Sequence, residues 1–191
     1  MDIKQTIQKS IDLKNSILEN QDLLMHISQS IEVIVHSLNE NGKIHFCGNG
    51  GSAADAQHLA AELSGRFYYN RPPLNAEALH CNTSYLTAVA NDFGYDHIFS
   101  RLLEATAHKG DVLVVLSTSG NSQNILEAAK YARNHGIKVI SLTGETGGKL
   151  AEISDILINV LSIDTPRIQE AHIMIGHIIC EQVESLIYPQ N

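Results

Sequence analysis

Two short segments rich in glycine and hydroxyl side chains are candidates for binding an anion. The first is Gly48–Ser52 (GNGGS) and the second is Ser117–Ser122 (STSGNS). Each follows an apolar run and precedes a helical pattern, and a loop between a strand and a helix presents backbone N–H groups to a ligand. The pattern predicts that the two loops together bind one anion, such as a phosphate group. An ordinary turn with a serine N-cap would need similar residues.

The helical pattern after the first loop carries a second chemical signal. His58 and Glu62 are four residues apart, so they share one helix face at about 6 Å from each other. Such a pair can bind a metal or act as an acid–base unit, and it can also be a plain surface pair. Its place behind a glycine loop, at the edge where open α/β sheets bind ligands, favours a function. Together these signals point to an enzyme acting on a phosphorylated small molecule.

The second loop is the stronger phosphate candidate. Ser117, Thr118, Ser119 and Ser122 supply four hydroxyls around Gly120, just before a helix whose N-terminus favours negative charge. Neither loop matches the GxGxxG fingerprint or a Gly-Lys-Ser/Thr nucleotide motif. The ligand is therefore expected to be a phosphorylated metabolite rather than a dinucleotide.

Three further polar side chains fall on a predicted C-terminal helix over 167–186. Gln169 and His177 are roughly 12 Å apart along a continuous helix axis. They can share one metal only if Gln169 lies outside the regular helix or if another subunit contributes. His177 has apolar sequence neighbours, which favours a core imidazole, and Cys180 is also expected in the core. His172 lies between Gln169 and His177.

One more polar pair precedes a glycine in the middle of the chain. Asn91 and Asp92 are followed by Phe93 and Gly94, which predicts a turn. Their side-chain oxygens are also suited to accept hydrogen bonds from sugar hydroxyls.

The elements that must position these residues alternate between short apolar runs and helical patterns. Near-continuous apolar strands indicate burial on both faces, which is typical of a parallel sheet flanked by helices, and the predicted fold class is α/β with five parallel strands. The strands are expected at 43–47, 76–80, 112–116, 137–142 and 156–160. The helices of this part are expected at 53–64, 83–91, 96–108, 122–135 and 148–153.

The first forty residues read as one or two amphipathic helices, with Ile3, Ile7 and Ile11 in one apolar stripe and Ile27, Ile31 and Ile34 in the next. Each stripe must pack against the domain itself or against a second subunit, and we expect the subunit. Because no linker or repeat interrupts the chain, a single domain over 1–191 is predicted, made of a helical region (1–40) and an α/β core with a C-terminal helix (41–191).

Composition narrows the function classes. The chain has 191 residues, 43% of them hydrophobic, and a net charge of −8, so no basic field suggests nucleic acid binding. No apolar stretch approaches the ~20 residues that span a bilayer, which predicts no membrane partner. The three cysteines form no CxxC pair, which favours reduced thiols and a cytoplasmic location.

Over nearly its whole length the sequence resembles the bacterial phosphoheptose isomerase family, whose members have the sugar-isomerase (SIS) fold. The resemblance rests on motifs that recur together and in order. They are Cys47–Ser52, Asp55, His58, Glu62–Arg66, Asn91–Gly94, Ser117–Ser122, Leu142–Gly144, Gly147–Lys149, Arg167–Glu170, His172 and His177.

The resemblance implies conversion of sedoheptulose 7-phosphate to D-glycero-D-manno-heptose 7-phosphate, the first step toward ADP-heptose for the lipopolysaccharide core. It implies a cytoplasmic homotetramer with active sites at subunit interfaces, and one zinc ion per subunit held by His58, Glu62, Gln169 and His177. The implied substrate contacts are Asn49, Gly50, Gly51, Ser52, Glu62, Asn91, Asp92, Ser117, Thr118, Ser119, Ser122 and Gln169.

An aldose–ketose isomerase moves a proton between two carbons through an enediol, so it needs a base, an acid and a grip on the remote phosphate. We assign Glu62 as the base and His177 as the acid that protonates or polarises the carbonyl. A carboxylate that also binds zinc is a weaker base, and the sequence leaves open which role Glu62 takes.

A non-enzymatic relative of the same fold, a tetramer that binds the bacterial replication initiator, is the alternative. Ala53-Ala54, where isomerases often have His-Cys, and the ending Tyr188-Pro189-Gln190 depart toward that relative. Glu62 and His177 favour the isomerase, because the relative lacks both.

Overall fold

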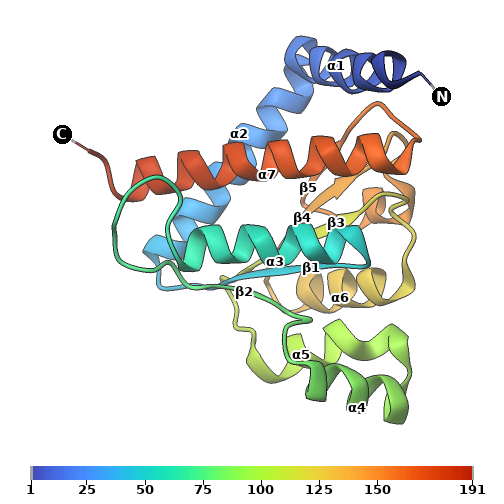
Figure 1. Ribbon diagram of the computed structural model, residues 1–191. Helices are drawn as coiled ribbons and strands as arrows, with labels where there is room; N and C mark the ends of the chain where they lie inside the picture. The colour runs from blue at the N-terminus through green and yellow to red at the C-terminus, as the bar shows by residue number, and fades with distance from the viewer. Residues whose placement is uncertain (1, 191) are drawn as a thin grey trace.

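The protein is built on five parallel strands in the order β2-β1-β3-β4-β5 (Figure 1). The structure is a computed structural model that describes residues 2–190. The strands are β1 (Ile44–Gly48), β2 (Ala76–Ala78), β3 (Val112–Ser117), β4 (Lys138–Thr143) and β5 (Ile156–Asn159). These strands agree with the five predicted runs within two residues at each end, and the α/β parallel-sheet prediction is confirmed.

The central strands are buried on both faces because almost every residue in them is apolar. All residues of β1 and β3 are buried, and alternate side chains enter two different cores. Val112 and Val114 belong to one core, whereas Leu113 and Val115 belong to the other. This alternation follows from the two-residue period of a strand and requires a helical layer on each face of the sheet.

Helices supply both layers (Figure 1). Side chains of α2, α3 and α7 line the first core, and those of α4, α5 and α6 line the second. The α-helices are α1 (Ile3–Glu19), α2 (Gln21–Asn39), α3 (Gly51–Ser64), α4 (Thr83–Phe93), α5 (Ile98–Thr106), α6 (Gln123–Asn134) and α7 (Thr165–Ile187), and the short 3₁₀ helices are η1 (Tyr95–His97) and η2 (Gly148–Glu152).

The end of α4 differs from the sequence prediction. Asn91 and Asp92 were expected in a turn, but α4 continues through Phe93 and stops at Gly94, whose φ of +90° a helix cannot accommodate. Asn91 and Asp92 therefore belong to the last helical turn of α4 and not to a loop. A glycine with positive φ is the usual helix stop, and it lies two residues beyond the pair.

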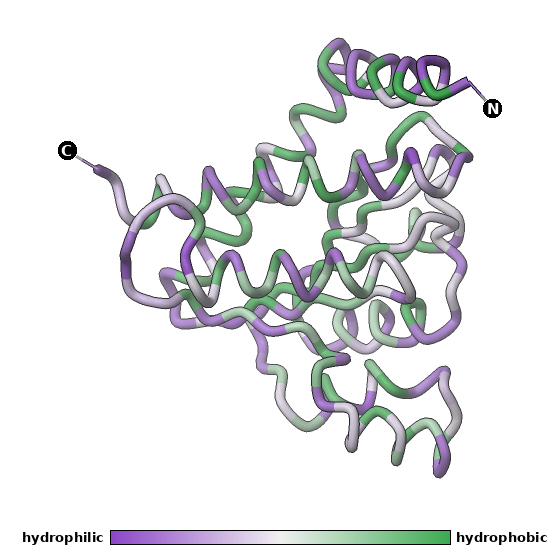
Figure 2. The backbone as a smooth tube through the Cα atoms, in the orientation of Figure 1, coloured by the Kyte–Doolittle hydropathy of each residue, from purple (hydrophilic) through white to green (hydrophobic). Residues whose placement is uncertain are grey.

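The N-terminal region forms two helices that bury different amounts of apolar surface. The stripe of α2, including Ile27, Ile31 and Ile34, packs on the chain's own core, which corrects the expectation that this stripe would face a subunit. Along α1, Leu13 and Ile17 are buried, but Ile3, Ile7, Ile11 and Leu18 are 44–73% exposed. Figures 1 and 2 show α1 lying away from the sheet with hydrophobic positions along its length.

Two further expectations concern the chain as a whole. Cys47, Cys81 and Cys180 are all free thiols, as the cysteine spacing predicted. Within residues 2–190, none of the helices has the length and apolar character that a bilayer crossing requires.

Candidate active site

The two glycine and serine loops meet where the strand order reverses. The chain passes from β1 to β2 on one side, and β3 lies on the other side of β1, with Gly48 paired to Leu116 at the carboxyl ends. Ligands of open α/β sheets bind at this kind of switch point. The loops that follow β1 and β3 are therefore neighbours at one edge of the sheet, as the motifs required.

A pair of reciprocal amide hydrogen bonds joins the first loop to α6. Asn49 Nδ2 donates to Asn124 Oδ1 at 2.9 Å, and Asn124 Nδ2 donates to Asn49 Oδ1 at 2.9 Å. The Tyr95 hydroxyl donates to the same Asn49 oxygen at 3.0 Å. Sequence analysis missed Asn124 and Tyr95, because neither belongs to a motif and each acts through Asn49. The buried position of a polar Asn124, 2% exposed, is visible only in the fold.

The hydroxyl side chains of the second loop differ in exposure. Ser117 is buried and its Oγ lies 3.4 Å from Ser122 Oγ, while Thr118 is half-buried and Ser119 is exposed. In the described chain Ser122 makes no side-chain cap bond to α6, so the ordinary serine N-cap does not account for this residue. Gly120, with φ of +65°, lies so close to Gly147 that a Cβ there would overlap the Gly147 carbonyl oxygen. The loop is thus held in a shape that only glycine permits.

The side-chain amide of Gln169, a residue of α7, lies against the start of α3 and not beside His177. A Cβ on Gly51 would come 2.7 Å from Gln169 Nε2, so the glycine makes room for this amide. Ser52, in the same first turn, is buried, and Gly50 has a φ of +57°. Because Gln169 is inside the regular helix α7, it and His177 can share one ligand ion only if another subunit contributes.

His58, Glu62 and His177 converge on the neighbouring helices α3 and α7. His58 Nε2 is 3.0 Å from Glu62 Oε1 and 3.3 Å from His177 Nε2. The side chain of His58 is 49% exposed and that of Glu62 is 25% exposed, so the group faces solvent. The edge of the Phe67 ring approaches His177, with ring centroids 5.8 Å apart. His58 and Glu62 of α3 thus form one cluster with His177, which is 119 residues from His58 in the sequence.

The core imidazole of α7 is His172, and the expectation that His177 is a core residue was wrong. His172 is fully buried, its Nε2 lies 3.1 Å from the Thr143 carbonyl oxygen, and burial lowers its pKa to about 4. His177 is half-buried and faces α3. The two residues are five positions apart, so they lie on different helix faces, and only the packing of α7 decides which face is inside. Cys180 is buried, as predicted.

A carboxylate one turn before His58 lies near the cluster. Asp55 Oδ2 is buried without a hydrogen-bond partner among residues 2–190. Burial raises the pKa of Asp55, and the nearby His58 and His177 oppose that rise. The Asp55 carboxyl group therefore lies close to both imidazoles.

The donor chemistry of the cluster suits zinc, which takes imidazole and carboxylate ligands. Two ligand atoms of tetrahedral zinc lie about 3.3 Å apart, the separation between His58 Nε2 and His177 Nε2. As they stand, however, no three or more His, Cys, Asp or Glu side chains in the described part of the chain are arranged to hold a metal ion. The zinc set of His58, Glu62, Gln169 and His177 stays a prediction.

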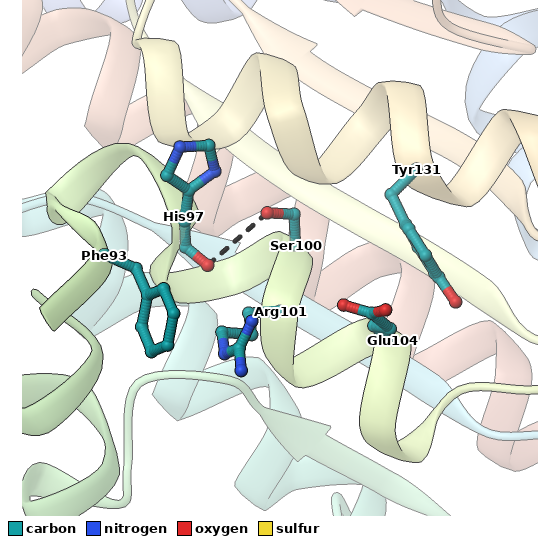
Figure 3. A pocket seen from close by; sticks show the side chains of 6 residues that line it. All are labelled: Phe93, His97, Ser100, Arg101, Glu104 and Tyr131. Atoms are coloured by element: carbon teal, nitrogen blue, oxygen red, sulfur yellow. Dashed lines mark hydrogen bonds between the residues drawn. The ribbon is translucent and has the colours of Figure 1, made fainter.

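Neither of two cavities of similar volume holds the cluster. One of about 290 Å³ is bordered by Thr118 and Ser119. The other, of about 300 Å³, lies between α4, α5 and α6, where the Arg101 guanidinium is 3.8 Å from the centre of the Phe93 ring (Figure 3). It contains no predicted site residue. Since Glu62 is roughly 16 Å along α3 from its start, the phosphate loop and the cluster of one chain are well separated.

Asn91 and Asp92 are exposed at the end of α4, where Asn91 Nδ2 donates to Asp92 Oδ1 at 2.8 Å. The hydrogen bond from Tyr95 to Asn49 brings the segment after α4 against the first loop. The pair is therefore near the switch point, and its role as a substrate contact stays a prediction.

Comparison with known proteins defines the class that this fold and site represent. The family model described as SIS domain matches residues 7–144. A phosphoheptose isomerase of Aneurinibacillus thermoaerophilus is 50% identical over 97% of this chain and 94% of its own, and one of Mycobacterium bovis is 51% identical over 94% and 92%. The protein is thus a SIS-domain protein.

Solved structures agree with the sequence comparison. Phosphoheptose isomerase from Neisseria gonorrhoeae superposes with a TM-score of 0.90 at 44% identity, covering 96% of this chain and 97% of its own. The enzyme from Francisella tularensis has a TM-score of 0.92 at 36% identity, covering 96% of both chains. The chain belongs to the phosphoheptose isomerase family, and it is an isomerase acting on a sugar phosphate.

Proposed function

We propose that this chain converts sedoheptulose 7-phosphate to D-glycero-D-manno-heptose 7-phosphate. The observation that carries the proposal is the convergence of Glu62 and His177 on His58 across α3 and α7. A carboxylate and an imidazole in one exposed cluster are the acid–base pair that an enediol mechanism needs. The role in making the ADP-heptose of lipopolysaccharide follows from this substrate and belongs to the same proposal.

The phosphate of the substrate binds at the serine loop. Ser117, Thr118, Ser119 and Ser122 provide hydroxyls, and the start of α6 provides backbone N–H groups and a favourable dipole. The sugar hydroxyls bind at Asn49, which Asn124 and Tyr95 hold in one orientation. The other contacts are Gly50, Gly51, Ser52, Asn91, Asp92 and Gln169.

Proton transfer is the task of the cluster. Glu62 takes a proton from C1 of the ketose while His177 donates a hydrogen bond or a proton to the oxygen on C2, which gives the enediol. Glu62 then returns the proton to C2, and the hydroxyl on C1 gives its proton to His177 as the aldehyde forms, which restores the proton that His177 donated. One proton leaves carbon and one returns, so the reaction needs no oxidant.

Zinc is the cofactor of this proposal, held by His58, Glu62, Gln169 and His177 at one ion per subunit. When bound, it supplies positive charge that stabilises the developing oxyanion. Glu62 can act as a metal ligand or as the base. The test measures both the zinc content and the turnover rate of the freshly purified protein. Zinc at one ion per chain supports the cofactor, and active protein free of metal contradicts it.

A homotetramer completes the site in this proposal. Within one chain the cluster lies well along α3 from the serine loop, and Gln169 is two helical turns from His177, so neighbouring subunits must bring these groups together. The exposed apolar stripe of α1 is the surface available for packing against another copy.

The decisive experiment incubates the purified protein with sedoheptulose 7-phosphate and follows the product by NMR. Appearance of the manno-heptose 7-phosphate supports the isomerase. No conversion, together with tight binding of the replication initiator, would favour the non-enzymatic alternative.

A further inference from the structure

A buried ion pair fastens the connection after α3 to the C-terminal half of α7. Arg71 Nε donates to Glu184 Oε1 at 2.9 Å, and the two side chains are only 2% and 1% exposed. Glu184 also accepts the backbone N–H groups of Phe67 at 2.8 Å and Tyr68 at 2.7 Å. Burial by itself would raise the pKa of Glu184, but these three donors outweigh it and lower the pKa. The carboxylate is thus charged and fully paired.

The remaining donors of Arg71 go to the end of α3. Nη2 donates to the carbonyl oxygen of Glu62 at 2.9 Å, and Nη1 donates to those of Leu63 at 2.7 Å and Gly65 at 3.0 Å. The last carbonyl groups of a helix lack partners within it, and a cation is favourable there. Arg71 therefore holds the backbone of Glu62, the proposed base, and connects it to Glu184.

Glu184 acts on the same helix that carries His177, the proposed acid. The two are seven residues apart on α7, so they lie on one face about two turns from each other. Phe67, whose N–H binds Glu184, places its ring edge against His177. Upstream, Gly176 lets Leu59 of α3 approach closely, since a Cβ there would be 2.5 Å from Leu59 Cδ1. The helices are therefore held together on both sides of the cluster.

We propose that Arg71 and Glu184 are positioning residues for the isomerisation, because their ion pair holds the Glu62 turn of α3 and the Phe67 ring against α7. The proposal rests on the proposed function of Glu62 and His177. Proton transfer requires close placement of both groups, and a displacement of about 1 Å can slow a reaction about 100-fold. Only an arginine has enough donors in one plane to bind a carboxylate and several carbonyls together.

The test compares Arg71→Lys and Glu184→Gln with a matched control, Asp111→Asn. Asp111 is also a buried carboxylate with two backbone N–H donors, from Lys43 and His108, and one side-chain donor, His45. It lies just before β3, and its hydrogen bonds go to Lys43, His45 and His108, none of which is in α3, α7 or the connection after α3. The control therefore removes the same kind of interaction without touching α3 or α7.

All three variants are expected to lower Tm, but only Arg71→Lys and Glu184→Gln should lower kcat, by about tenfold or more. KM for sedoheptulose 7-phosphate should stay within about threefold, because the serine loop is unchanged. If Asp111→Asn lost as much kcat as the other two variants, the losses would be explained by lower stability alone. That result would overturn the proposal. So would a folded Glu184→Gln that retains kcat.

If Glu184→Gln does not fold, the double variant Arg71→Met/Glu184→Leu replaces it, since apolar replacement of a buried ion pair is often tolerated. A second measurement needs no turnover: ¹H–¹³C spectra of the His58 and His177 rings in metal-free protein. These signals should shift in Glu184→Gln and stay in place in Asp111→Asn. Unmoved signals contradict the positioning role, whereas an inactive wild-type protein contradicts only the proposed function.

Discussion

At the scale of single residues, the orientation of each polar group depends on its partners, and those of Asn49 lie outside every motif. Asn49 is fixed by Asn124 and Tyr95, whereas His58 lies between Glu62 and His177. The motif residues supply the chemistry, and their partners decide which atom faces the ligand.

Glu62→Gln should abolish turnover, because an amide cannot accept the proton from carbon, and general-base catalysis contributes about 10²–10⁴-fold. The fold should persist, since the Glu62 side chain faces solvent and its backbone bond to Arg71 is unaffected. Steady-state kinetics and circular dichroism check both. Glu32→Gln, an exposed carboxylate on α2, is the control and should keep full activity. Activity of Glu62→Gln within a few-fold of wild type would refute the assignment.

The buried imidazole of His172 predicts a dependence of stability on pH. Its native pKa is about 4, below the value of about 6.5 in an unfolded chain, so between these values only the unfolded state binds the proton. The free energy of unfolding should therefore increase as pH rises from 4 to 6.5, by up to about 1.4 kcal/mol per pH unit from this group.

His172→Gln should make this pH dependence shallower, because the amide does not titrate and can still donate to the Thr143 carbonyl. Urea unfolding of both proteins at several pH values between 4 and 7.5 measures the difference. His45, whose pKa is also lowered by burial, contributes to both proteins equally. Parallel curves for the two proteins would show that His172 is not the responsible group.

At the scale of elements, the site depends on how neighbouring segments contact each other. The serine loop after β3 is pressed against the Gly147–Gly148 segment after β4, and α3 lies beside α7 along its length. Each contact passes through a glycine, at Gly120 and at Gly176. Backbone shape at these positions therefore controls both the phosphate loop and the acid–base cluster.

Gly120→Ala should damage phosphate binding while leaving the acid–base cluster in place. The alanine Cβ would overlap the Gly147 carbonyl oxygen, and φ of +65° is itself strained for alanine, at about 1 kcal/mol or more. We expect KM for the phosphosugar to rise about tenfold with a smaller change in kcat. Inhibition by inorganic phosphate should weaken in parallel, and an unchanged phosphate affinity would contradict the predicted site. Gly110→Ala, also at positive φ but in open space, is the control for strain alone.

At the scale of the whole molecule, a single chain leaves two features incomplete. The stripe of α1 with Ile3, Ile7 and Ile11 is exposed, and the serine loop and the cluster lie apart. Contiguous apolar surface of this kind marks interaction sites, and assembly of identical chains would bury it and bring the parts of the site together.

Ile7→Glu should weaken the assembly, because it places a charge in the proposed interface, and activity should fall with the oligomer. Light scattering after gel filtration measures the mass, and turnover is followed across protein concentrations. Gln5→Glu adds the same charge to the opposite face of α1 and should leave the mass unchanged. A monomeric wild-type protein, or an Ile7→Glu variant with the wild-type mass and activity, would contradict this role of α1.

The strands, the order of the loops and the identity of the chemical groups could all be predicted from the amino-acid sequence. These features depend on local patterns: the apolar run of β3, the glycines after β1 and the four-residue spacing of His58 and Glu62 each act within one segment. The family resemblance added the family and the class of enzyme, an isomerase of sugar phosphates, and the comparisons confirmed both.

Which residues contact one another became known only from the folded chain. Periodicity places His172 and His177 on different faces of α7. In the folded chain His172 is buried against β4, whereas His177 contacts His58 of α3. Asn124 is 75 residues from Asn49, and Glu184 is 113 residues from Arg71 and 117 from Phe67. Contacts between distant segments depend on how helices pack on the sheet, and that packing is a property of the whole chain, so no local pattern could reveal it.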